Sequence, residues 1–110
     1  MKFKANICTC ENSFDKVLSV CQSVPGARIL NEVIIQRGPK QFDVFDDVPG
    51  PKISFDEYGF DMEPGPENII FSGDIMTIVL SGHEDIEVDI SGLTKEEKKE
   101  LQVVAIEIFK

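Results

Sequence analysis

Residues 68–97, NIIFSGDIMTIVLSGHEDIEVDISGLTKEE, contain the clearest signals of secondary structure in the chain. Two runs rich in Ile, Val and Phe flank Gly73-Asp74, a pair of residues typical of a tight hairpin turn. A third run, residues 86–90, alternates apolar and acidic residues, as a strand with one buried face does. The sequence therefore predicts three consecutive antiparallel strands in this stretch.

A helix is expected over residues 94–109. Thr94 and Glu97 have the spacing of a capping box, in which each side chain accepts a hydrogen bond from the other residue's backbone amide. The expected buried stripe consists of Leu101, Val104, Ala105 and Ile108. Three further apolar residues widen it: Val103, Ile106 and Phe109. This is more apolar surface than a one-sided helix needs, so we expect deep packing in a curved sheet or contact with a partner.

The first 40 residues predict a strand, a helix and a strand. Residues 2–9 alternate between apolar and polar side chains, which predicts a half-buried strand. The predicted helix has an apolar stripe of Phe14, Val17, Leu18, Cys21 and Val24, and Pro25-Gly26 ends it. Residues 28–36 carry apolar side chains on both faces, which favours a central strand.

The middle of the chain, residues 42–67, contains eight carboxylates together with several aromatic residues. Gly-Pro pairs at 38–39, 50–51 and 65–66 predict turns, because proline cannot donate to a strand ladder. Between these turns, residues 41–47 and 52–60 read as two short edge strands with acidic outer positions.

These elements predict one α+β domain over residues 1–110, in the order β-α-β-β-β-β-β-β-α. The sheet is expected to be mostly antiparallel, with about six or seven short strands, one helix near the N-terminus and one C-terminal helix. This order resembles the helix-grip order of the Bet v 1-like proteins. That resemblance implies an apolar ligand held under the last helix.

The net charge is −9 and unevenly distributed. Residues 1–40 carry six bases and three acids, a net +3, whereas residues 41–110 carry five bases and seventeen acids, a net −12. Such a field repels nucleic acid and membrane surfaces and attracts basic proteins. With three cysteines, no secretory leader and no apolar run near the roughly 18 residues of a membrane helix, we expect a cytoplasmic protein.

The sequence predicts no metal, no cofactor and no enzymatic activity. An EF-hand beginning at residue 56 would need oxygen ligands where Tyr58 and Phe60 stand. Cys8 and Cys10 lie about 6.6 Å apart along one strand face, which is wide for a disulfide. His83 is the only histidine, and no Walker A, G-x-S-x-G or H-E-x-x-H motif occurs.

From this profile we predict a small acidic binding protein that inhibits or neutralises a basic partner. Such partners include a toxin, a nuclease or other nucleic-acid-binding protein, and a component of a defence system. Immunity proteins and phage-borne anti-defence inhibitors share this profile. The predicted partner contacts are Asp43, Asp46, Asp47, Asp56, Glu57, Tyr58, Asp61, Glu63, Asp85, Glu87 and Asp89. The last three alternate along one strand at about 6.6 Å, a pitch at which carboxylates mimic nucleic-acid phosphates.

Two other interpretations stay open. The first is a small-molecule binder with its pocket between the sheet and the helix over residues 94–109, suggested by the excess apolar surface of that helix. The second is a homodimer formed through the same helix or through an open sheet edge.

Overall fold

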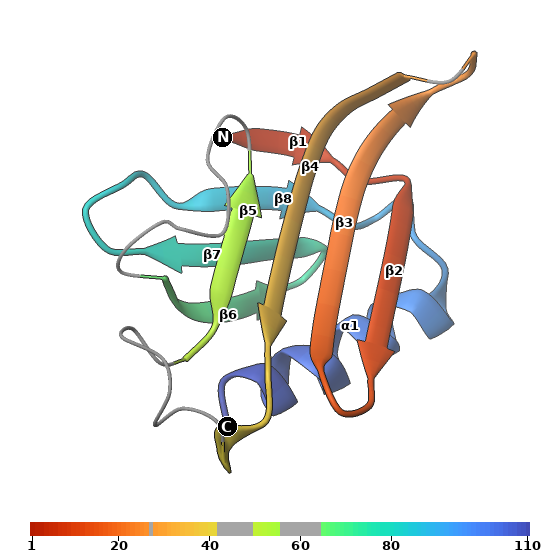
Figure 1. The fold of residues 1–110 in the computed structure, drawn as a ribbon. Coiled ribbons are helices and arrows are strands. Elements are labelled where there is room, and N and C mark those ends of the chain that lie inside the picture. The colour runs from red at the N-terminus through yellow and green to blue at the C-terminus, as the bar shows by residue number, and fades with distance from the viewer. Residues whose placement is uncertain (27, 42–49, 56–64) are drawn as a thin grey trace.

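The computed structural model describes residues 1–26, 28–41, 50–55 and 65–110. These residues form two four-stranded sheets and one α-helix (Figure 1). Sheet A has the strand order β1-β8-β7-β6, and sheet B has the order β2-β3-β4-β5. Within the described residues all the strand pairs are antiparallel except β1–β8, which is parallel.

The strands of sheet A are β1 (Lys2–Lys4), β6 (Pro66–Ser72), β7 (Ile75–Leu80) and β8 (Ile86–Asp89). The strands of sheet B are β2 (Ile7–Asn12), β3 (Lys16–Val24), β4 (Arg28–Arg37) and β5 (Lys52–Phe55). The helix α1 spans Lys95–Ile108.

The two sheets and the helix share one hydrophobic core. In Figure 1 the strands of sheet A run across those of sheet B, and α1 lies against β2 and β3. Completely buried side chains come from sheet B (Leu18, Ile35), from sheet A (Ile78, Val88) and from α1 (Leu101). Burial of apolar surface from three elements is the main term that holds the layers together.

The chain passes from sheet A to sheet B between two consecutive residues. The Ala5 N–H donates to the carbonyl of Asp89, at the end of β8, with an N–O distance of 2.9 Å. The next amide, that of Asn6, donates to the carbonyl of Cys21 in β3 at 3.0 Å. The single strand predicted over residues 2–9 is therefore wrong, because β1 and β2 belong to different sheets.

The Asn6 side chain reinforces this change of sheet. Its Nδ2 donates to the Ser23 carbonyl at 2.8 Å, and its Oδ1 accepts the Ser23 N–H at 2.9 Å. The pairing of β3 with β4 shifts register between Gln22 and Ser23, a bulge at the same place. The Asn6 side chain thus both donates to and accepts from the backbone of Ser23, just beyond the end of the β2–β3 ladder.

A second junction between the sheets lies at their other edges. Gly65 precedes β6, the edge strand of sheet A, and Pro51 precedes β5, the edge strand of sheet B. A Cβ atom at Gly65 would collide with the carbonyl oxygen of Pro51. Only glycine fits this close approach, so the Gly65-Pro66 pair sets the distance between the two edges.

The hairpin, the last strand and the C-terminal helix are confirmed. β6 and β7 pair around Gly73, whose φ of 58° is the left-handed conformation that the turn requires. Ile86 and Val88 of β8 point into the core. α1 begins directly after its N-cap residue Thr94, which forms the predicted capping box with Glu97 in the first turn. Its buried residues are Leu101, Val104, Ala105 and Ile108, as expected.

The helix predicted from Phe14 to Val24 is wrong, because this segment is β3. Leu18 and Val20 are buried on one face with the period of a strand, whereas Phe14 and Val24 are 65% and 36% exposed. The segment contains three valines, two serines and a cysteine, residues with weak helix propensity. Its long pairing with β4 therefore decides its conformation.

The α+β class with two terminal helices is corrected accordingly. The described residues form a mostly β fold of two sheets with one C-terminal helix, and no helix follows the first strand. The helix-grip order does not fit this arrangement. The central strand predicted over residues 28–36 is β4, which lies between β3 and β5. The strand predicted over residues 41–47, and the part of residues 52–60 that follows β5, lie outside the described residues.

Replacement of Asn6 tests the importance of the sheet change. We expect Asn6→Ala to lower the free energy of unfolding by about 1–2 kcal/mol, because two hydrogen bonds to Ser23 are lost. The measurement is urea denaturation followed by circular dichroism. The matched control is Asn12→Ala, at the far end of β2, whose side chain has no hydrogen-bond partner within the described residues. Equal stabilities of the two variants would contradict the role assigned to Asn6.

Candidate functional site

Most of the residues predicted to contact a partner lie outside the described residues. These are Asp43, Asp46, Asp47, Asp56, Glu57, Tyr58, Asp61 and Glu63. The other three, Asp85, Glu87 and Asp89, lie on or just before β8. The structure therefore shows the surroundings of only this last group.

The carboxylates on and near β8 have partners within the protein. Glu87 forms an ion pair with Lys2 of β1 at 3.2 Å, and the register of the parallel pair places these two residues side by side. Lys4 is the register partner of Asp89 in the same way. Asp85 precedes the strand, and its Oδ1 accepts the Leu80 N–H at 3.3 Å. The row predicted to mimic phosphates is thus partly neutralised by two lysines of β1.

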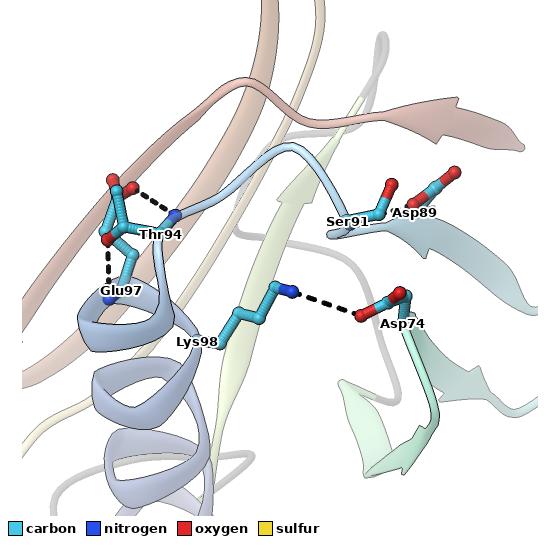
Figure 2. Close-up of polar contacts among 6 residues, drawn as sticks. All are labelled: Asp74, Asp89, Ser91, Thr94, Glu97 and Lys98. Carbon is cyan, nitrogen blue, oxygen red and sulfur yellow. Dashed lines mark hydrogen bonds and ion pairs between the residues drawn. The ribbon is translucent and has the colours of Figure 1, made fainter.

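Asp89 is held by the residue that begins the next turn. Its Oδ1 accepts the Ser91 N–H at 2.9 Å (Figure 2). Hydrogen bonds from the hydroxyl and the N–H of Ser91 lower the pKa of Asp89, and the nearby ammonium groups of Lys4 and Lys98 lower it further. The carboxylate at this position therefore stabilises the turn that leads into α1.

The N-terminal end of α1 is fixed to sheet A. Thr94 Oγ1 accepts the Glu97 N–H at 3.1 Å, and a Glu97 carboxylate oxygen accepts the Thr94 N–H at 2.9 Å. Lys98 reaches back from the helix to Asp74 in the β6–β7 turn, with an Nζ–Oδ1 distance of 3.1 Å (Figure 2). These contacts set the direction in which the helix leaves sheet A.

The other end of α1 forms an open hollow with β6, which we call the β6–α1 groove. Its volume is about 540 Å³. The residues that line it are Asn68, Ile69, Phe71, Gln102, Ala105, Ile106, Phe109 and Lys110. The lining combines apolar side chains from the strand and the helix with two amides and one ammonium group. This composition is typical of sites for small apolar molecules.

Only part of the excess apolar surface of α1 lines the β6–α1 groove. Ile106 is 65% exposed and lines the β6–α1 groove. Val103 is 45% exposed and does not line it. Ile70, on β6, is half exposed as well. The groove therefore accounts for part of the surface that the sequence shows to be in excess.

A second, smaller hollow lies beside the end of the helix and has the opposite electrostatic character. Its volume is about 270 Å³. Its lining includes four of the basic residues, Lys16, Arg37, Lys40 and Lys110, together with Glu107. Three of these four bases belong to the first 40 residues, so the net +3 of that segment is partly concentrated here.

The cysteines are the remaining reactive groups. The Sγ atoms of Cys8 and Cys10 are 3.8 Å apart, and the thiol of Cys21 is buried. Within residues 1–26, 28–41, 50–55 and 65–110, no group of three or more His, Cys, Asp or Glu side chains could hold a metal ion. His83 lies in an exposed turn. In the same part of the chain no helix is long and apolar enough to cross a membrane.

Comparison with protein-family models and with curated protein sequences finds no match to this chain.

Removal of one hydroxyl tests the contacts of Asp89. We expect Ser91→Ala to raise the pKa of Asp89 towards its usual value, because one hydrogen bond to the carboxylate is lost. A depressed folded-state pKa means that this carboxylate stabilises the fold above its unfolded pKa of roughly 3.9. The stabilisation disappears as pH falls through the folded-state pKa.

The measurement is an NMR titration of the Asp89 carboxyl carbon. Ser72→Ala, at the exposed end of β6, serves as the control and should leave the Asp89 titration unchanged. An unaltered pKa in Ser91→Ala would show that the backbone N–H and the lysines alone set it.

Proposed function

We propose that the protein is a non-enzymatic binding protein whose β6–α1 groove holds an apolar small molecule with a neutral or cationic head. The observation that carries this proposal is the groove itself, which combines a volume of about 540 Å³ with a mostly apolar lining. Ligand sites commonly have volumes of roughly 300–1,000 Å³ and bury most of a small ligand.

The apolar part of the ligand contacts Ile69 and Phe71 on the strand, and Ile106 and Phe109 on the helix. Each square ångström of apolar surface that leaves water on binding contributes about 25 cal/mol before the cost of association. Asn68 and Gln102 stand among these side chains and supply donors and acceptors that orient a polar head group.

The charge of the protein selects the head group. The net charge of −9 repels anions over distances of several ångströms. Lys110 is the one cation among the described residues that line the groove, and it is paired with Glu107 at 3.5 Å. The overall negative charge therefore favours a neutral or positively charged head group over a fatty carboxylate, while the basic residues of the adjacent smaller hollow act in the opposite sense.

A charge placed in the groove tests this proposal. We expect Ile106→Glu to weaken binding of the neutral probe Nile red by at least about tenfold, because the apolar probe would have to desolvate the new carboxylate. Val103→Glu is the matched control, since it makes the same change in the same helix but outside the groove lining. The measurement is a fluorescence titration.

Two results would contradict the groove proposal. One is equal Nile red affinity in both glutamate variants. The other is a larger thermal shift with decanoate than with decyltrimethylammonium, since the charge argument requires the cationic amphiphile to stabilise the protein more.

A second proposal rests on the charge of the chain rather than on the groove. The net −12 of residues 41–110 suits an acidic protein that docks on a basic protein and inhibits or neutralises it. The partner would be a nuclease, a toxin or another nucleic-acid-binding protein. Affinity in such a complex falls as salt rises, because screening weakens the attraction.

Charge reversal tests the second proposal. A basic protein captured from a host lysate at low salt and released at high salt provides the ligand for a biosensor measurement. We expect Asp46→Lys with Asp47→Lys to slow its association by about tenfold, since long-range attraction governs the encounter rate. The control is Glu11→Lys with Asp15→Lys, which changes the net charge by the same amount elsewhere. Equal rates for the two double variants would place the interface away from residues 46 and 47.

A further inference from the structure

Two thiols meet on one face of β2, outside both proposed binding surfaces. The Sγ atoms of Cys8 and Cys10 lie 3.8 Å apart, and both residues are half-buried and free. We propose that this pair is a thiol–disulfide exchange site that reacts with neutral or cationic low-molecular-weight disulfides. It is independent of the β6–α1 groove.

The side chains bring the sulfurs closer than the backbone spacing alone suggests. The two Cα atoms stand about 6.6 Å apart along a strand, near the upper end of the range of up to roughly 6.8 Å that disulfides span. The sulfurs already touch, and a bond requires them to close from 3.8 Å to about 2.05 Å. The resulting bridge is strained and easily reduced, which suits exchange rather than permanent cross-linking.

The position of β2 allows this closure. Among the described strands β2 is an edge strand of sheet B that pairs only with β3, where Cys8 faces Val20 and Cys10 faces Leu18. Shortening the strand between the two cysteines therefore distorts one ladder rather than two. The third cysteine does not compete, because Cys21 pairs with Ile7 on the other face of the sheet and is only 5% exposed.

The contact between the thiols gives them different reactivity. The hydrogen bond from the Cys8 thiol lowers the pKa of Cys10, and the same bond raises the pKa of Cys8. Burial raises the pKa of Cys8 further. Cys10 is therefore the attacking thiolate, and Cys8 is the thiol that resolves the mixed disulfide.

The exchange proceeds in two balanced displacements. The Cys10 thiolate attacks one sulfur of a disulfide RSSR, so that a bond forms between Cys10 and SR while RS⁻ leaves. Cys8 then gives up its proton and attacks the Cys10 sulfur, which forms the internal disulfide and releases the second RS⁻. The two protein thiols lose two electrons, RSSR gains them, and the two protons end on the two released thiols.

The neighbouring helix selects the class of disulfide. The carboxylates of Glu97 and Glu100, in the first turns of α1, oppose the ionisation of both thiols, although at Cys10 the hydrogen bond from Cys8 outweighs them and the pKa is lowered. The same charges repel an anionic disulfide and attract a cationic one. Cystamine, which is cationic, and oxidised glutathione, which is anionic, are therefore the discriminating pair of probes.

The test follows the mass of the full chain during incubation with cystamine at neutral pH. We expect the wild-type protein to lose two hydrogens, with a peptide map placing the bridge between Cys8 and Cys10. Cys8→Ser should stop at the mixed disulfide on Cys10, whereas Cys10→Ser should react at least about tenfold more slowly, because the lowered-pKa thiol is gone. Cys21→Ala, the control for thiol number, should behave like the wild type. Circular dichroism checks that each variant is folded.

Three outcomes would overturn the proposal. The first is a wild-type protein that keeps all three thiols free, and the second is one that accumulates an unresolved mixed disulfide. The third is an equal rate with oxidised glutathione and cystamine at low salt, which would remove the role of the helix carboxylates. If the proposal holds, cystamine reacts about tenfold faster than oxidised glutathione. We expect Glu100→Gln to bring the rates with cystamine and oxidised glutathione closer together, because it removes one of the two carboxylates that act on the thiols.

Discussion

The change of sheet between Ala5 and Asn6 holds the two sheets in a fixed arrangement. Two consecutive amides donate to different sheets, so the position of sheet A fixes that of sheet B. The turn before α1 meets the same point, where a Cβ atom on Gly92 would lie 3.2 Å from the carbonyl oxygen of Ala5. Ala5 is completely buried as a result. Both sheets and the start of the helix are therefore positioned by one short segment of backbone.

The two ends of α1 lie in regions with different chemistry. Its first turns, tied to sheet A by the Lys98–Asp74 ion pair, place two carboxylates near the dithiol of β2. Its last turns leave Ile106 and Phe109 facing β6 across an apolar hollow. The start of the helix thus lies beside the thiol pair of β2 and its end lies beside the β6–α1 groove, and the capping box fixes where the helix begins.

The sequence predicts those parts of the fold that local chemistry determines. Gly73 permits the hairpin turn, and Thr94 with Glu97 begins the helix, because each needs only neighbouring residues. The prediction of a helix over residues 16–24 is wrong. Val17, Leu18 and Cys21 fit the spacing of a helical stripe, but pairing with β2 and β4 makes the segment a strand.

The contacts of the acidic row and the groove could not be predicted, because each requires two segments far apart in the chain. Nothing near Glu87 indicates that Lys2 lies beside it. The groove likewise needs β6 and the end of α1 together. The contact between Cys8 and Cys10 is predictable from the sequence, since alternate residues of a strand share a face.

The parallel pair β1–β8 also determines the order in which the protein can fold. The β6–β7–β8 meander forms from contacts between neighbours in sequence, but β1 waits for a partner that lies more than 80 residues away. Contacts of such long range slow folding, because a large loop must close first. During synthesis, Phe3 therefore leaves the ribosome well before its partner strand β8 and is buried only after β8 has been made.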